Sequence, residues 1–115
     1  MPRVLLVEDE VLVAMYVEDV LSDLGCEVVS LATRLEDALG QARALAFDFA
    51  VLDINLAGHM SFPVAAVLRE RKIPFVFISG YTSGAMIDEF RNEVRLRKPL
   101  RTPELARAIE RMRPV

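Results

Sequence analysis

A short apolar run at residues 49–52, Phe-Ala-Val-Leu, stops abruptly at Asp53, and Asn55 and a glycine-containing loop follow. An apolar run of this length, bounded by turn residues, is typical of a strand buried on both faces, as in a parallel sheet covered by helices. Comparable runs recur at residues 4–7, 26–31 and 73–78, and residues 94–97 alternate apolar and charged side chains. The sequence therefore predicts five strands, of which the first and third are buried and the fifth is a half-exposed edge strand.

Segments with apolar residues at helical spacing follow each predicted strand. They predict helices over residues 11–24, 35–45, 63–71, 85–91 and 103–112. Strict alternation of strands and helices indicates an α/β fold, a doubly wound (βα)5 arrangement whose five-stranded parallel sheet has helices on both faces. At 115 residues, the chain is expected to be one domain, residues 1–115.

Capping signals stand at several of these helix ends. An acid before the first helix, a capping box before the second and a hydroxyl before the last are expected to satisfy free N–H groups. A glycine is expected to end the first helix. The residues concerned are Glu8 or Asp9, Thr33 with Glu36, Thr102, and Gly25.

Composition excludes several classes of protein. A single cysteine, Cys26, allows no internal disulfide and no multi-cysteine zinc site, and no apolar stretch is long enough for a membrane span. The N-terminus does not resemble a signal peptide, so a cytoplasmic location is expected. Residues 91–115 hold 8 of the 14 Lys and Arg residues but 3 of the 17 Asp and Glu residues. This basic end is too short and too interrupted by apolar residues for a nucleic-acid arm, and we interpret it as a charged face that can dock an acidic partner.

Polar residues stand at the ends of four predicted strands. Glu8 and Asp9 follow the first strand, Asp53 ends the third, Ser79 follows the fourth and Lys98 follows the fifth. Because the carboxyl ends of parallel strands open on the same edge of a sheet, we expect these side chains to converge there. Taken alone, Asp53 could equally well be an aspartate that merely begins a loop. Polar residues at the ends of four strands are not explained in that way.

Clustered carboxylates repel one another, and a divalent cation removes that repulsion. Oxygen ligands suit Mg²⁺. Asp9 and Asp53 are candidate direct ligands, Glu8 binds directly or through water, and Asn55 offers its backbone carbonyl. Mg²⁺, a lysine and a hydroxyl together can share the charge of a transferring phosphoryl group, with Asp53 as the available nucleophile.

Over essentially its whole length the chain resembles a receiver domain of bacterial two-component response regulators. Four segments carry the resemblance: Val7-Glu8-Asp9-Glu10, Leu52-Asp53, Ser79-Gly80 and Lys98-Pro99. The resemblance implies a flavodoxin-like receiver fold in which Asp53 accepts phosphate from a histidine kinase or phosphotransfer protein. It also implies Mg²⁺ held by Asp9, Asp53 and the Asn55 carbonyl, with Ser79 and Lys98 moving to the phosphoryl oxygens.

Two positions bear on how such a domain would switch. Receivers usually carry an aromatic residue three positions before the lysine, where this chain has Arg95. Residues 74–81 resemble the Pro-Phe-x-Phe-Ala-Thr-Gly-Tyr stretch of a subgroup of mostly single-domain receivers. We therefore interpret Tyr81, together with Ser79, as a candidate switch residue; simple packing of Tyr81 in its loop is the alternative.

Three functional hypotheses remain open. The favoured one is a phosphorylatable switch, a monomer or weak dimer, that signals by protein contact through the face of the fourth helix, fifth strand and fifth helix. It would be no enzyme beyond assisting its own phosphorylation and dephosphorylation, and a start at Met1 with an end soon after the last helix favours a stand-alone protein. An adaptor that is never phosphorylated is the second. The third, a Mg²⁺-dependent phosphatase, typically needs an aspartate where this chain has Asn55.

Overall fold

The computed structural model describes residues 1–80 and 87–114. Five strands form one parallel sheet in the order β2-β1-β3-β6-β7. Their bounds are Arg3–Val7 for β1, Glu27–Ala32 for β2, Phe49–Asp53 for β3, Phe75–Ser79 for β6 and Arg95–Arg97 for β7. The predicted α/β fold class is confirmed, including the position of the half-exposed strand at an edge of the sheet.

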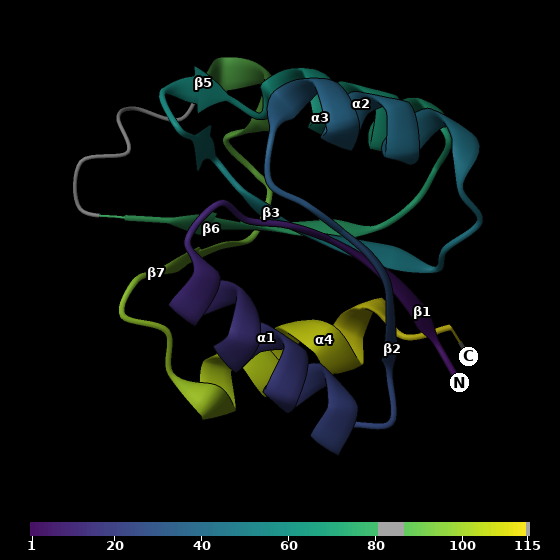
Figure 1. Cartoon of the computed structure of the whole chain (residues 1–115), viewed down its shortest axis with the longest axis vertical. Helices are drawn as coiled ribbons and strands as arrows, with labels where there is room; N and C mark the ends of the chain where they lie inside the picture. Colours follow the sequence, from purple (N-terminus) through teal and green to yellow (C-terminus); the bar gives the residue numbers. More distant parts are fainter. Residues whose placement is uncertain (81–86, 115) are drawn as a thin grey trace.

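Helices cover both faces of this sheet (Figure 1). The helices α2 and α3 lie on one face, and α1 and α4 lie on the other. Their bounds are Val11–Asp23 for α1, Leu35–Ala44 for α2, Phe62–Glu70 for α3 and Thr102–Met112 for α4. The N-terminus and the end of α4 lie on the amino side of the sheet, where β1 begins.

Two apolar cores result from the alternation of side chains along each strand. In β1, Leu5 and Val7 pack in the core under α2 and α3, whereas Val4 and Leu6 pack in the core under α1 and α4. All five residues of β3 are buried, which explains why the sequence shows a continuous apolar run there. Both faces of the sheet are therefore sealed, and the edge formed by the strand ends is left for polar chemistry.

The chain reverses its winding direction between β1 and β3. From β1 it crosses to β2 at one side, and it then returns to β3 on the other side of β1. Neighbouring crossovers diverge at such a point, which leaves a crevice outside the carboxyl ends of the two strands. The residues that follow β1 and the last residue of β3 lie at this crevice.

Two local predictions fail. The expected helix over residues 85–91 is wrong for its described part: Asp88–Phe90 is a short 3-10 helix, η1, whose Phe90 packs in the aromatic cluster with Phe62, Phe75 and Phe77. The segment after Asp53 was expected to be a glycine-containing loop, but Asn55–Leu56 (β4) and His59–Met60 (β5) pair as a small antiparallel hairpin. Two-residue strands carry too little periodicity to be seen in a sequence.

The predicted N-terminal caps are also wrong, whereas the glycine cap is confirmed. The residues at the N-cap positions of α1, α2 and α4 are Glu10, Arg34 and Arg101, and none makes a side-chain capping hydrogen bond. Gly25 follows α1 with a φ of 77°, a left-handed conformation that suits glycine, and its N–H donates to Ser22 O. Among the described residues, no helix is long and apolar enough to cross a membrane.

Candidate functional site

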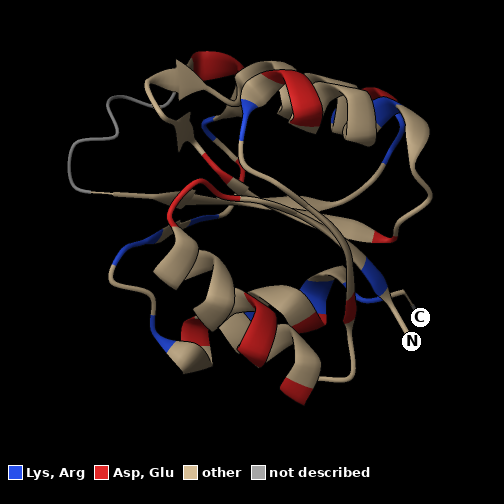
Figure 2. Cartoon of the chain, in the orientation of Figure 1, with Lys and Arg blue, Asp and Glu red and all other residues tan. Residues whose placement is uncertain are grey.

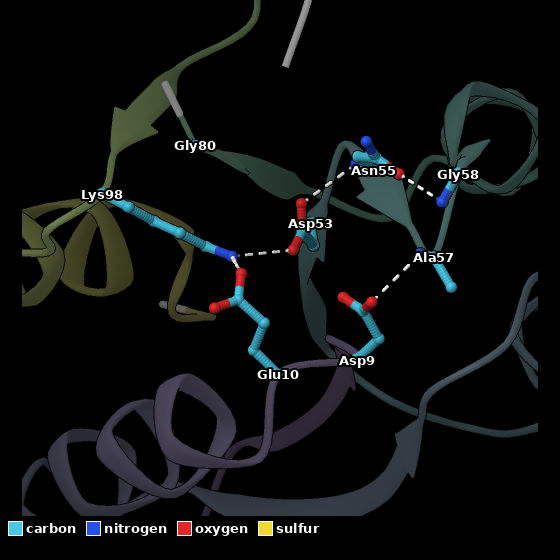
Figure 3. Close-up of a pocket in the computed structure, with 8 residues that line it drawn as sticks. All are labelled: Asp9, Glu10, Asp53, Asn55, Ala57, Gly58, Gly80 and Lys98. Carbon is cyan, nitrogen blue, oxygen red and sulfur yellow. Dashed lines mark hydrogen bonds and ion pairs between the residues drawn. The ribbon is translucent and has the colours of Figure 1, made fainter. Parts of the chain in front are cut away.

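A cavity of about 200 Å³ opens at the carboxyl edge of the sheet, beside the point where the winding reverses. Its walls come from the loop after β1, the end of β3, the β4–β5 hairpin and the residues after β6 and β7 (Figure 3). The lining residues are Asp9, Glu10, Asp53, Asn55, Ala57, Gly58, Gly80 and Lys98. Asp9, Asp53 and Lys98 thus face one cavity, as the strand-end argument requires.

Lys98 is the centre of the charge arrangement in this cavity. Its Nζ lies 2.9 Å from Asp53 Oδ2, 2.5 Å from Glu10 Oε1 and 3.3 Å from Glu8 Oε1. The Lys98 side chain is 13% exposed and that of Asp53 is 4% exposed. Burial alone would lower the pKa of Lys98, but hydrogen bonds to Glu10 and Asp53 and the nearby carboxylate charges raise it overall, so the ammonium group stays charged.

Glu8 is the most deeply buried acid of the site, with 1% of its surface exposed. Burial, reinforced by a hydrogen bond to Asp53 and by its charge, raises the Glu8 pKa to about 8, against the opposing effects of the Glu10 N–H and of Lys98. The Glu10 N–H donates to Glu8 Oε2 at 3.1 Å. The other oxygen, Oε1, has no hydrogen-bond partner among the described residues, because Lys98 approaches it only as an ion pair. A buried carboxylate oxygen that has an ion pair but no hydrogen bond is stabilised further by a bound proton or metal cation.

Asp9 and Asn55 shape the opposite wall of the cavity. Asp9 Oδ2 accepts a hydrogen bond from the Ala57 N–H at 3.0 Å, which ties the loop after β1 to the β4–β5 hairpin. The Asn55 N–H donates to Asp53 Oδ1 at 3.0 Å, and Asn55 Oδ1 accepts from the Gly58 N–H at 2.7 Å. Both oxygens of Asp53 therefore have a fixed partner, one from the hairpin and one from Lys98.

The remaining candidate residues lie at or beyond the edge of this cavity. Ser79 is 2% exposed at the end of β6, and its carbonyl accepts from the Lys98 N–H at 2.8 Å; the next residue, Gly80, lines the cavity. Arg95 pairs with Phe77 across β6 and β7 and is half-buried. Tyr81 lies outside the described residues, so its proposed switch role is not addressed by the structure.

Glu10 is a site residue that the sequence analysis did not select. Together with Glu8 and Asp53 it forms a group of carboxylates whose oxygens lie within 4.8 Å of one another. Asp9, which was selected, is not part of that group. The only signal for Glu10 in the sequence is that it is the third consecutive acid in Glu8-Asp9-Glu10. Whether its side chain points into the cavity or into solvent depends on the direction of the chain between β1 and α1, which the sequence pattern does not show.

Comparison with known families identifies this arrangement. The model of the response regulator receiver domain matches residues 4–110. The chain belongs to this family. The flavodoxin-like strand order and the acidic cavity at the carboxyl edge are thus those of a phosphoacceptor receiver domain, which takes part in two-component signalling.

Solved structures and a curated relative agree with this assignment. SdrG from Sphingomonas melonis Fr1 is 36% identical, with a TM-score of 0.88 over 97% of this receiver domain and 96% of that chain. The response regulator PhyR from Brucella abortus is 28% identical, with a TM-score of 0.82 over 96% of this domain and 47% of PhyR. The protein-glutamate methylesterase/protein-glutamine glutaminase of Archaeoglobus fulgidus is 36% identical over 81 residues, which are 70% of this domain and 23% of that protein. The receiver domain thus spans about a quarter of its curated relative.

Receiver domains bind Mg²⁺ through acidic residues, and the donor set of this chain fits that ion. The three clustered carboxylates are hard oxygen ligands, and Glu8 Oε1 is a buried oxygen with no hydrogen bond among the described residues. When all three acids are ionised, the single charge of Lys98 does not neutralise them, and a divalent ion would offset the excess.

Proposed function

We propose that Asp53 is the phosphoacceptor of this receiver domain. The observation that carries the proposal is the Asp53 carboxylate itself: it ends the central strand, faces the cavity, and has Lys98 Nζ 2.9 Å from Oδ2. A carboxylate held in place by a lysine and a backbone N–H is a positioned nucleophile for phosphoryl transfer. The donor is a histidine kinase or a phosphotransfer protein.

The transfer follows from the geometry around Asp53. An oxygen of Asp53 attacks the phosphorus of a phosphohistidine, a P–O bond forms, and the P–N bond breaks as its electron pair returns to the imidazole. Lys98, and Ser79 after it turns toward the cavity, then donate hydrogen bonds to the phosphoryl oxygens. When bound, Mg²⁺ supplies positive charge to those oxygens. Its proposed ligands are Glu8, Asp9, Asp53 and the Asn55 carbonyl, and Glu10 is added as a further acid near the ion.

The proposed output is a change in protein contacts at the face formed by η1, β7 and α4. The side chains of Arg95, Arg97 and Arg101 line a groove beside Pro99 and make no ion pair with any described residue. Unpaired arginines favour an acidic partner surface. Lys98 connects this groove with the phosphorylation cavity, because it lines both.

Phosphorylation of Asp53 is tested by incubating the chain with Mg²⁺ and phosphoramidate and measuring its intact mass. We expect the wild type to gain one phosphoryl group and Asp53→Asn to gain none. Asp19→Asn, which changes an exposed aspartate of α1, is the matched control and should be phosphorylated like the wild type. Equal phosphorylation of wild type and Asp53→Asn would reject Asp53 as the acceptor.

The same experiment separates the alternatives. A chain that gains no phosphoryl group under any of these conditions is an adaptor, and rapid multi-turnover release of phosphate would indicate a phosphatase. The phosphatase has less support, because Asn55 stands where a second carboxylate is needed as general acid, and its side chain is engaged with Gly58.

A further inference from the structure

Lys98 is held by a carboxylate that is neither the proposed nucleophile nor one of the metal ligands expected from the sequence. Lys98 Nζ lies within hydrogen-bond distance of both Glu10 Oε1 and Asp53 Oδ2. Figure 3 shows the extended Lys98 side chain ending between these two carboxylates, with Glu10 reaching in from the start of α1. The backbone of Glu10 is fixed in turn, because its N–H donates to Glu8 Oε2 at 3.1 Å.

Glu10 and Asp53 differ in how freely they can leave Lys98. The Asp53 side chain is 4% exposed and has a second hydrogen bond to the Asn55 N–H, so it stays in the cavity. The Glu10 side chain is 59% exposed, and its carboxylate can rotate into water at little cost. The Glu10–Lys98 contact is therefore the one that opens when Lys98 needs another partner.

A phosphoryl group on Asp53 would create that need. It brings a charge of about −1.5 to −2 and strong acceptor oxygens into the cavity. The ammonium group of Lys98 has three N–H donors. Glu10 competes with the phosphoryl oxygens for these donors, and its negative charge also repels the phosphoryl group. Both effects disfavour the phosphorylated state.

We propose that Glu10 is a positioning residue that holds Lys98 in the unphosphorylated receiver domain and must release it before Lys98 can bind the phosphoryl group. Glu10 thereby sets how readily the domain enters its phosphorylated state. The inference rests on the proposed role of Asp53 as phosphoacceptor, and it adds a residue from outside the carboxylate pair and the lysine of the family motif.

Beryllofluoride, which occupies the place of a phosphoryl group on an aspartate, provides the test. It is titrated at saturating Mg²⁺, so that any contribution of Glu10 to metal affinity is removed, and binding is followed by NMR. Glu10→Gln keeps the size of the side chain and removes its charge. We expect it to bind beryllofluoride roughly twofold to fivefold more tightly than the wild type, as for the loss of a partly exposed ion pair.

Two further measurements make the test specific. Glu70→Gln, at the exposed end of α3, makes the same change of net charge and should bind like the wild type. The side-chain NMR signals of Lys98 in free Glu10→Gln should move toward their positions in the beryllofluoride complex, whereas those in Glu70→Gln should not. Glu10→Gln affinity equal to or weaker than that of the wild type overturns the inference and leaves Asp53 as acceptor untouched. Absence of binding to the wild type overturns both proposals.

Discussion

The two edges of the parallel sheet use charge in opposite ways. At the amino edge, arginines donate to main-chain carbonyls where helices end: Arg71 donates to Ala42 O and to Leu45 O, the latter at 3.0 Å, and Arg113 donates to Leu24 O. At the carboxyl edge, three carboxylates converge on one lysine. Figure 2 shows the acidic segments after β1 and at the end of β3 gathered at that edge.

The difference separates stability from function. Arginines at helix C-termini satisfy free carbonyls and match the negative end of the helix dipole, so each contact stabilises the fold. The carboxyl edge instead places two buried acids, Glu8 and Asp53, against one lysine, so ionisation of Glu8 there is unfavourable in the absence of a further cation. The first edge is arranged for folding, and the second contains the proposed metal and phosphoryl site.

Removal of Lys98, the basic residue that lines the acidic cavity, should have the largest effect. Lys98→Ala leaves the buried carboxylates of Glu8 and Asp53 without a counter-ion, and we expect the free energy of unfolding to fall by about 3 kcal/mol at pH 8 without Mg²⁺. Urea denaturation measures this change. Arg97→Ala removes an exposed arginine of β7 and should change stability by less than about 0.5 kcal/mol. Equal losses in the two variants would contradict the account of this edge.

The pH dependence of stability should show the strain at Glu8. In the folded protein Glu8 keeps its proton up to a pKa of about 8, whereas its ordinary value is 4.5. The folded state therefore binds more protons than the unfolded state between these values, and stability without Mg²⁺ falls as the pH rises through this window, by up to about 1.4 kcal/mol per pH unit.

Glu8→Gln is the variant that checks this dependence. It cannot lose a proton, so its stability between pH 5 and pH 8 should be nearly flat in urea denaturation without Mg²⁺. A wild type with no slope, or a variant that keeps the full slope, would show that Glu8 is not the strained group.

Substitutions at the amino edge should lower the free energy of unfolding by less, and by an amount that does not depend on Mg²⁺ or on pH. Arg71→Ala removes the donor to the carbonyls at the end of α2 and the contact of the guanidinium with the Phe47 ring, 5.5 Å from its centroid. We expect a loss of about 1.5 kcal/mol. This loss should be the same at pH 5 and pH 8 and with or without Mg²⁺, and Arg107→Ala, on the exposed face of α4, serves as control. A loss that varies with Mg²⁺ would mean that the two edges are coupled.

The fold was predictable because its strongest signals are physical requirements of buried strands. Residues 4–7 and 49–52 are apolar throughout, since both faces of β1 and β3 are covered by helices. The predicted caps failed because their polar side chains found partners in the tertiary structure: Asp9 binds the Ala57 N–H and Thr102 binds the Tyr16 hydroxyl. Sequence spacing contains no information on such distant partners.

The sequence predicted which strand ends supply the residues of the site, but not the directions of their side chains. Parallel topology requires the residues after β1, β3 and β7 to share an edge, so Asp9, Asp53 and Lys98 could be placed together. The direction of each side chain within the cavity depends on the loops. Neither the loop after β1 nor the β4–β5 hairpin has a periodic sequence pattern that would reveal these directions. The sequence therefore did not show that Glu10 contacts Lys98 or that Asp9 contacts the hairpin.

The central claim, that the carboxyl edge is strained without a metal ion and relieved by it, is tested most directly by the free energy of unfolding of wild type and Asp53→Asn, each with and without saturating Mg²⁺ at pH 8. Without Mg²⁺, Asp53→Asn should be at least as stable as the wild type. With Mg²⁺, the wild type should gain at least about 1 kcal/mol more than the variant. A variant that is less stable without Mg²⁺ and gains as much from the ion as the wild type would contradict the claim.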